Sequence, residues 1–241
     1  MPLPAQVKDL GVLKVSGESG KFCIPVNKIA LSGRDRVARG NDRAVYFHPD
    51  YPDVLFKVLL DLSEIRLKGF RGCSLRMFPS TRMRAIFKEF ECYISVQTRV
   101  GTAEGDLPIP RMLGFVETDL GSASIVERIQ DGAGVIGPNL LSMRESGAFG
   151  REHVPLLNDF AQRLLSWKVR TTDMNMLNVS YGIRDGRPQF VLVDGIGDNF
   201  AIPIRTWSER AMKRGHSRSF AKIARHFDLV WDPVAHRFVE G

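Results

Sequence analysis

The sequence predicts a protein of the α+β class, with a strand-rich first half and a helix-rich second half that divide near residue 130. Short runs of β-branched and aromatic residues dominate the first half. One long stretch with helical spacing, 80–99, interrupts them. An apolar stripe with helical spacing follows at 154–168. With 241 residues and an apolar fraction of 44%, the chain is long enough to bury a large core.

Each expected element has a local reason in the sequence. The strands are apolar runs bounded by turn-forming residues, at 10–15, 43–48, 54–60, 112–117 and 122–129. The long helix begins at Ser80 or Thr81, either of which can serve as its N-cap. We therefore expect two lobes, 1–129 and 130–241, that form one functional domain with a ligand-binding cleft between them.

The composition excludes several classes of protein. No apolar run is long enough to cross a membrane. The first six residues, MPLPAQ, lack the basic start and the apolar run of a secretory signal. The three cysteines form no C-x-x-C pair, so a structural zinc site is not expected. These features predict a cytoplasmic protein without a transmembrane segment.

The net charge of +7 is concentrated in two segments. Residues 61–88 contain seven Lys or Arg against two acidic residues, and residues 205–226 contain seven against one. Such segments can attract an anionic partner, namely a phosphorylated ligand, a nucleic acid or an anionic membrane surface. The alternative is that they are solvated helix faces.

The most informative stretch of the sequence is a pair of apolar runs joined by Asp185-Gly186. This dipeptide predicts a hairpin with a two-residue turn. Asn178 then lies opposite residue 193, and therefore beside Asp194, at the open end of the hairpin. Because directly opposed side chains lie about 5 Å apart, the amide of Asn178 and the carboxylate of Asp194 can together ligate Mg²⁺.

Asp173 precedes Asn178 by five residues, and we expect it in a loop at the same end of the hairpin. A carboxylate there can accept the proton of an attacking hydroxyl while Mg²⁺ neutralises phosphate oxygens. Each of these residues alone could be a helix cap or an Asx turn. Their combination favours phosphoryl transfer.

A phosphotransferase also needs a cation that binds the nucleotide phosphates. Lys57 is the only charged residue in its apolar run, although an exposed lysine on an edge strand is the alternative interpretation. Glu89 of the long helix is the candidate to orient Lys57, with Glu91 as the second choice. The backbone of Glu127-Arg128-Ile129 can offer hydrogen bonds to an adenine edge.

Several short motifs follow one another along the chain in a characteristic order. They are RAVYFHP at 43–49, FKV at 56–58, KEF at 88–90 with Tyr93, IPR at 109–111, GFVETDLG at 114–121, Asp173 to Asn178, DGIG at 194–197, and Ile202-Pro203 with Thr206-Trp207. This order resembles the protein-kinase superfamily and, more closely, the PhoP regulatory network protein YrbL family, a bacterial kinase-like group. The resemblance covers about residues 38–207 and implies a two-lobed kinase-like fold. It implies an antiparallel sheet with one long helix in the first lobe, and a short, mainly helical second lobe.

The sequence also departs from protein kinases. The counterpart of the phosphate-binding loop, 38–43, contains only Gly40, and Arg39 or Arg43 can contact phosphate directly instead. Thr171-Thr172 stands where protein kinases carry His-Arg, and Asn175 stands where they carry a lysine. No A-P-E element follows. These differences favour a small-molecule kinase or an ATP-binding regulator over a typical protein Ser/Thr kinase.

The leading hypothesis is therefore a phosphotransferase that uses ATP and Mg²⁺, with an unidentified phosphate acceptor. Two alternatives remain. One is a catalytically silent kinase-like regulatory protein. The other is a nucleic-acid-binding protein that uses the basic segments 61–88 and 205–226. A resemblance of residues 16–22, SGESGKF, to a P-loop is discounted because the first glycine and the final Ser or Thr are missing.

Overall fold

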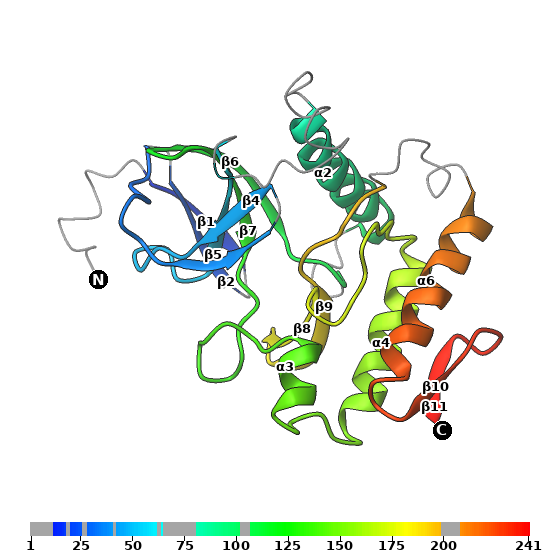
Figure 1. Ribbon diagram of the computed structural model, residues 1–241. Coiled ribbons are helices and arrows are strands. Elements are labelled where there is room, and N and C mark those ends of the chain that lie inside the picture. The colour runs from blue at the N-terminus through cyan, green and yellow to red at the C-terminus, as the bar shows by residue number, and fades with distance from the viewer. Residues whose placement is uncertain are drawn as a thin grey trace. The chain divides into compact units, whose positions relative to one another are not determined.

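The computed structural model describes residues 12–17, 20–25, 28–40, 42–61, 64, 81–101, 107–198 and 208–241. The chain divides into two compact units (Figure 1). Unit 1 comprises Met1–Arg82 and Arg111–Arg128, and unit 2 comprises Met83–Pro110 and Ile129–Gly241. The long helix thus belongs to unit 2, although two strands of unit 1 follow it in the chain.

Unit 1 contains a five-stranded antiparallel sheet. Its spatial order is β3 (Arg36–Arg39), β4 (Arg43–Tyr46), β5 (Val54–Leu59), β7 (Gly121–Glu127) and β6 (Met112–Thr118). The strands expected at 43–48, 54–60, 112–117 and 122–129 are all present within one or two residues of those limits. β3 was not expected, because all four of its residues are exposed and show no alternation of apolar and polar side chains.

A separate hairpin in unit 1 pairs β1 (Val12–Gly17) with β2 (Gly20–Pro25). The strand expected at 10–15 therefore begins two residues later, and its partner was not predicted. The stretch that resembles a P-loop lies in this hairpin, with Ser16 paired to Lys21. A P-loop joins a strand to a helix, so the structure agrees with its dismissal.

One face of the five-stranded sheet packs against the core of unit 1. Because side chains alternate along a strand, residues 54, 56 and 58 of β5 point to the same side. They form one buried cluster with residues from the neighbouring strands and from the segment before β3. The cluster includes Ile29, Leu31, Tyr46, Val54, Phe56, Val58, Val116 and Ile125. Lys57 consequently lies on the other face.

Unit 2 combines helices with two hairpins. The helices are α2 (Thr81–Val100), α3 (Leu140–Glu145), α4 (His153–Ser166) and α6 (Glu209–Ala224). The hairpins pair β8 (Val179–Arg184) with β9 (Arg187–Leu192), and β10 (Leu229–Asp232) with β11 (Arg237–Glu240). α4 and α6 lie side by side, and the β10–β11 hairpin lies next to them (Figure 1). The helices expected at 80–99 and 154–168 correspond to α2 and α4.

The β8–β9 hairpin has the register that the sequence predicts. Val179 pairs with Leu192, and Arg184 pairs with Arg187 across the turn. Asp185 and Gly186 both have positive φ angles, of 51° and 74°, as a type I′ turn requires. The buried Arg184 of this hairpin donates hydrogen bonds to the carbonyls of Leu107 and Ile109. Within unit 2, it thereby holds the segment that leads into the I-P-R motif against the β8–β9 hairpin.

None of the helices in the described ranges is both long enough and apolar enough to cross a membrane.

Candidate active site

Lys57 lies in the middle of the unit 1 sheet. It pairs with Val45 of β4 on one side and with Ser124 of β7 on the other. β5 is therefore a central strand, so the alternative of an exposed edge-strand lysine is wrong. Only 6% of Lys57 is exposed. A lysine is rarely buried to this extent unless its ammonium group is paired with a polar or charged partner.

Lys57 shares its face of the sheet with other polar groups. Arg43 lies two residues before Val45 on β4 and is half-buried, so the two-residue period places it on the same face. Ser124, directly opposite Lys57, is 2% exposed. Its hydroxyl has no hydrogen-bond partner among the residues that the structure describes. This face therefore combines two cations with a hydroxyl that a ligand could satisfy.

Gly40 lies at the turn between β3 and β4. Its backbone N–H donates to the carbonyl of Arg43 at 2.8 Å, which closes the hairpin tightly. The counterpart of the phosphate-binding loop is thus a short turn rather than a long glycine-rich cover. Gly40 itself is exposed.

The residues expected at an adenine edge already use part of their backbone. Glu127 donates its N–H to the carbonyl of Arg111 at 2.8 Å, and its side chain accepts the N–H of Arg111 at 2.9 Å. The carbonyl of Ile129 accepts a hydrogen bond from Gly137 at 2.9 Å. The N–H of Glu127 is therefore already used within the fold, whereas the carbonyl of Ile129 has a second lone pair that can accept another hydrogen bond.

In unit 2, the loop that carries Asp173 pairs with the loop that carries Asp194. The N–H of Thr172 donates to the carbonyl of Gly195, and the N–H of Gly197 donates to the carbonyl of Arg170, both at 2.8 Å. The hydroxyl of Thr172 also donates to the carbonyl of Gly197 at 2.6 Å. Three hydrogen bonds therefore fix the two loops to each other.

Asn178 connects both loops to the β8–β9 hairpin. Its side-chain Nδ2 donates to the carbonyl of Asp173 at 2.8 Å. Its own carbonyl accepts the N–H of Val193 at 2.8 Å, which continues the hairpin pairing by one residue. Asn178 therefore lies opposite residue 193, next to Asp194, as the sequence predicts. Since Nδ2 is directed at Asp173, the oxygen Oδ1 is the atom suited to a metal ion.

Asn175 orients the carboxylate of Asp173. Its Nδ2 donates to Oδ1 of Asp173 at 2.9 Å, and its Oδ1 accepts the N–H of Leu177 at 2.9 Å. Asp173 is exposed, so this amide is a specific restraint on an otherwise solvated carboxylate. The hydrogen bond fixes Oδ1 of Asp173, so the other carboxylate oxygen, Oδ2, points away from Asn175.

The two glycines of the DGIG motif explain why the loops fit together. Gly195 and Gly197 have φ angles of 75° and 96°, which favour glycine. A Cβ at 195 would lie 2.9 Å from the carbonyl carbon of Asp173. A Cβ at 197 would lie 2.8 Å from the carbonyl oxygen of Lys88 on α2. The motif therefore packs its backbone against the Asp173 loop on one side and against α2 on the other.

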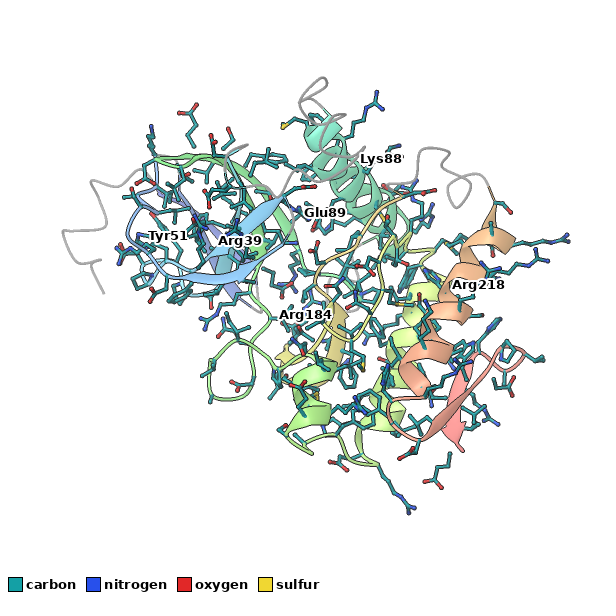
Figure 2. The ribbon with its side chains drawn as sticks, in the orientation of Figure 1. Arg39, Tyr51, Lys88, Glu89, Arg184 and Arg218 are labelled. Atoms are coloured by element: carbon teal, nitrogen blue, oxygen red, sulfur yellow. The ribbon has the colours of Figure 1, made fainter. Side chains whose placement is uncertain are left out.

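That contact lies next to Glu89. Glu89 is 2% exposed, whereas Glu91 is half-exposed and pairs with Lys88 at 3.0 Å and with Arg170 at 3.3 Å. The hydrogen bond from Lys88, followed by the charge of Arg170, lowers the pKa of Glu91. Lys88 and Glu89 lie on different sides of α2 (Figure 2). Of the two acids considered as partners of Lys57, Glu89 is thus buried and Glu91 lies at the surface.

The sequence as a whole matches one family. A sequence model of the PhoP regulatory network protein YrbL family aligns with residues 29–228, which is most of the chain. The chain belongs to this YrbL family. No curated protein sequence gives a significant match.

The YrbL-family chain is also similar to solved kinase structures. A double mutant of the PknI kinase domain from Mycobacterium tuberculosis is 14% identical, with a TM-score of 0.45, over 83% of this chain and 79% of that one. The Rio2 kinase–ADP/Mg²⁺–phosphoaspartate complex from Chaetomium thermophilum is 11% identical, with a TM-score of 0.46, over 92% and 66%. The bifunctional kinase-methyltransferase WbdD is 14% identical, with a TM-score of 0.44, over 76% and 34%. The chain thus spans about a third of the length of WbdD.

Two motifs of this YrbL-family chain have structural roles. His48 is buried, its Nδ1 accepts the N–H of Asp50 at 3.2 Å, and burial lowers its pKa. Asp119 accepts the N–H of Leu31 at 2.7 Å and that of Ser32 at 3.0 Å, and the first of these bonds is the main reason that its pKa is lowered. The HP and VETD elements therefore shape turns of unit 1.

The donor set fits Mg²⁺ bound together with a nucleotide. Within the described ranges, no group of three or more His, Cys, Asp or Glu side chains could hold a metal ion. Mg²⁺ commonly takes only one or two protein oxygens and completes its shell with substrate phosphates and water. The amide oxygen of Asn178 and the carboxylate of the half-buried Asp194 suit that pattern.

Sequence reasoning gave no role to four residues of this region. Thr172 joins the two loops, Arg170 joins them to α2, and Asn175 orders the Asp173 loop internally. The buried Asp198 directly follows the DGIG motif. Arg170 also accepts a weak hydrogen bond from Sγ of Cys92 at 3.7 Å through its carbonyl. Asn175 was recognised only as a departure from a lysine. The sequence signal that could have identified Asn175 is its position two residues after the candidate base Asp173.

Proposed function

We propose that this YrbL-family protein is a kinase-like phosphotransferase that uses ATP and Mg²⁺. The observation that carries the proposal is the packing of the DGIG loop. Gly195 abuts the backbone of Asp173, and Gly197 abuts the backbone of Lys88, next to the buried Glu89. One short motif thereby fixes the candidate metal ligand Asp194 relative to the candidate base.

In the proposed reaction, Asp173 accepts the proton of an acceptor hydroxyl. The acceptor oxygen forms a bond to the γ-phosphorus of ATP, the bond from that phosphorus to the β,γ-bridging oxygen breaks, and ADP leaves with the electron pair. Asn175 holds Oδ1 of Asp173, so Oδ2 is the oxygen proposed to take the proton. Bound Mg²⁺ would supply neutralisation of the phosphate charge.

Asn178 and Asp194 are the proposed metal ligands. The hydrogen bond from Asn178 to the carbonyl of Asp173 ties the orientation of the amide to the loop of the base. Metal binding and positioning of the base are therefore coupled through one side chain.

Lys57 is proposed to bind the nucleotide phosphates, and Arg43 is proposed to assist it. Both lie on the face of the unit 1 sheet that is opposite to its core, and Ser124 on that face has a hydroxyl suited to a phosphate or ribose oxygen. We further propose that Glu89 orients the ammonium group of Lys57.

Nucleotide binding without transfer is the second candidate function, because the β3–β4 turn is closed by the bond from Gly40 to Arg43. A long flexible cover over the phosphates is absent from these described residues. A regulator that binds ATP would need the ligands of the metal and phosphates but would not need Asp173 as a base.

A single series of variants separates these functions. ATP should raise the melting temperature of the wild type only when Mg²⁺ is present, because a ligand of the folded state stabilises that state. Asp194→Asn should remove the dependence on Mg²⁺, while Asp173→Asn should keep it and lose release of ADP. Asp185→Asn, at the exposed hairpin turn, is the matched control. Mg²⁺-dependent binding without any ADP release in the wild type would favour the regulator. An unchanged Mg²⁺ requirement in Asp194→Asn would refute Asp194 as the metal ligand, and the absence of any ATP-dependent shift in the wild type would refute both functions.

A further inference from the structure

Helix α6 carries a line of positive charge that the proposed transfer chemistry does not use. One side of the helix is buried in unit 2, through Met212, Gly215, His216, Phe220, Ile223 and Ala224. The exposed positions on the rest of the helix hold only charged residues. Four of them are basic, and we name them the basic stripe: Arg210, Arg214, Arg218 and Lys222 (Figure 2, in which Arg218 is labelled).

The basic stripe has a regular geometry. Its members are four residues apart, so each is about 6 Å further along the helix axis and about 40° around it. The four charges together extend over about 18 Å. Because the opposite side of α6 packs in the interior, this line is held rigidly at the surface of unit 2.

The positive charge of the stripe is not cancelled locally. The only carboxylate on α6 is Glu209, and it is held by Lys168 at 2.7 Å and by Lys213 at 2.9 Å. Among the residues that the structure describes, none of the four stripe side chains forms an ion pair. All four charges therefore remain available to a partner in solution.

We propose that the basic stripe binds the phosphate backbone of a double-stranded nucleic acid. A duplex presents one negative charge for about every 1.7 Å of its axis. About 18 Å of duplex thus offers roughly ten phosphates, enough to pair with all four cations at once. A small phosphorylated molecule would reach one or two of them.

The chemistry of the stripe also favours this partner over a membrane surface. Three of the four residues are arginine, whose planar guanidinium makes two parallel hydrogen bonds to a phosphate. A helix that lies in a membrane interface needs large apolar side chains that enter the lipid. The exposed positions of α6 contain none, because its apolar residues are buried in unit 2.

Salt dependence of binding is the decisive measurement. A fluorescent 20-base-pair duplex should bind the full chain at about 50 mM salt, and log K should fall with log [salt] with a slope of about −3.6, or about −0.9 for each neutralised phosphate. Arg214→Gln with Arg218→Gln should weaken binding and bring the slope to about −1.8. The matched control is Arg144→Gln with Arg151→Gln, two exposed arginines of unit 2 outside α6, which should keep the wild-type slope.

Three results would overturn the proposal. The first is an identical slope in the stripe variant and in the control variant. The second is binding to vesicles that contain phosphatidylglycerol, with no binding to the duplex. The third is binding to polyglutamate, with no binding to the duplex. Circular dichroism of both variants verifies the fold, and the ATP-dependent thermal shift should be the same in both, which separates this test from that of the proposed transferase.

Discussion

The Cα of Gly197 lies so near to Lys88 that a Cβ at this position would be 2.8 Å from the Lys88 carbonyl oxygen. This approach joins the loop of Asp194 to helix α2 at the residue before Glu89. The packing of this loop in unit 2 therefore requires glycine at position 197, where there is no room for a Cβ.

Replacing this glycine should be costly. Gly197→Ala combines a positive φ of 96° with a collision against backbone atoms that cannot rotate away, and we expect a loss of more than about 2 kcal/mol in the free energy of unfolding. Gly147→Ala is the matched control, because Gly147 also has a positive φ, of 70°, but has open space around its Cα. It should lose about 1 kcal/mol. Equal losses in urea denaturation would show that the contact with α2 is unimportant.

The amide of Asn175 should govern turnover without governing nucleotide binding. Asn175→Asp keeps the acceptor for the N–H of Leu177 but loses the donor to Asp173 and adds a like charge beside it. We expect kcat for ADP release to fall about tenfold or more while KM for ATP stays constant. Asn175→Ala loses both the bond to Asp173 and the bond from Leu177, so it should also lower the urea midpoint. Comparing the two variants separates the effect on the Asp173 carboxylate from a general loosening of the loop. A rise in KM with constant kcat would instead place Asn175 in nucleotide binding.

The hydroxyl of Ser124 should reduce the stability of the protein without ligand. Among described residues it is a buried polar group without a hydrogen-bond partner, so Ser124→Ala should raise the free energy of unfolding by about 1 kcal/mol. Ser142→Ala is the control, because the hydroxyl of Ser142 donates to the carbonyl of Asn139 at 2.9 Å. That variant should lose about 1 kcal/mol. If Ser124→Ala destabilises the protein as much as its control does, Ser124 has a partner in solution.

Glu209 should make stability depend on pH in the acid range. Hydrogen bonds from Lys168 and Lys213 lower its pKa from 4.5 to about 2. A carboxylate with a lowered pKa stabilises the folded state above its unfolded value, and that contribution is lost as pH falls from about 4.5 towards 2. Glu209→Gln should therefore be less stable than the wild type at pH 7, with a difference that shrinks on acidification. Because Glu209 is partly exposed, the effect should be small and should weaken with salt.

The measurement is the urea midpoint of both proteins at pH 7, 4 and 3. Glu145→Gln on α3 removes another exposed acid, which forms no ion pair with described residues, and it should leave the midpoint unchanged. A constant difference between wild type and Glu209→Gln over this range would contradict the predicted linkage.

The sequence was sufficient where local chemistry determines geometry. Asp185-Gly186 determines a two-residue turn, the turn determines the hairpin register, and the register places Asn178 opposite Val193. The apolar period of α2 and α4 likewise located both helices. In each case a few neighbouring residues contain the information.

Other features are determined by contacts that no local pattern records. β3 is a strand because β4 pairs with it, although its four residues are all exposed. The roles of Thr172 and Arg170 depend on backbone atoms of a loop more than twenty residues away. The placement of α2 in unit 2, and the closure of the turn at Gly40, also follow from three-dimensional packing and from no sequence signal.

Cys92 offers a direct view of this junction in solution. Its thiol is fully buried, burial raises its pKa, and it donates to the same carbonyl of Arg170 that receives the N–H of Gly197. A thiol reagent can therefore reach Cys92 only when α2 and the Arg170 segment separate for a moment. In a chain whose other two cysteines are replaced, the rate of labelling of Cys92 measures how often the contact between α2 and the Arg170 segment opens. Cys92 is thus a built-in probe of local unfolding next to the candidate active site.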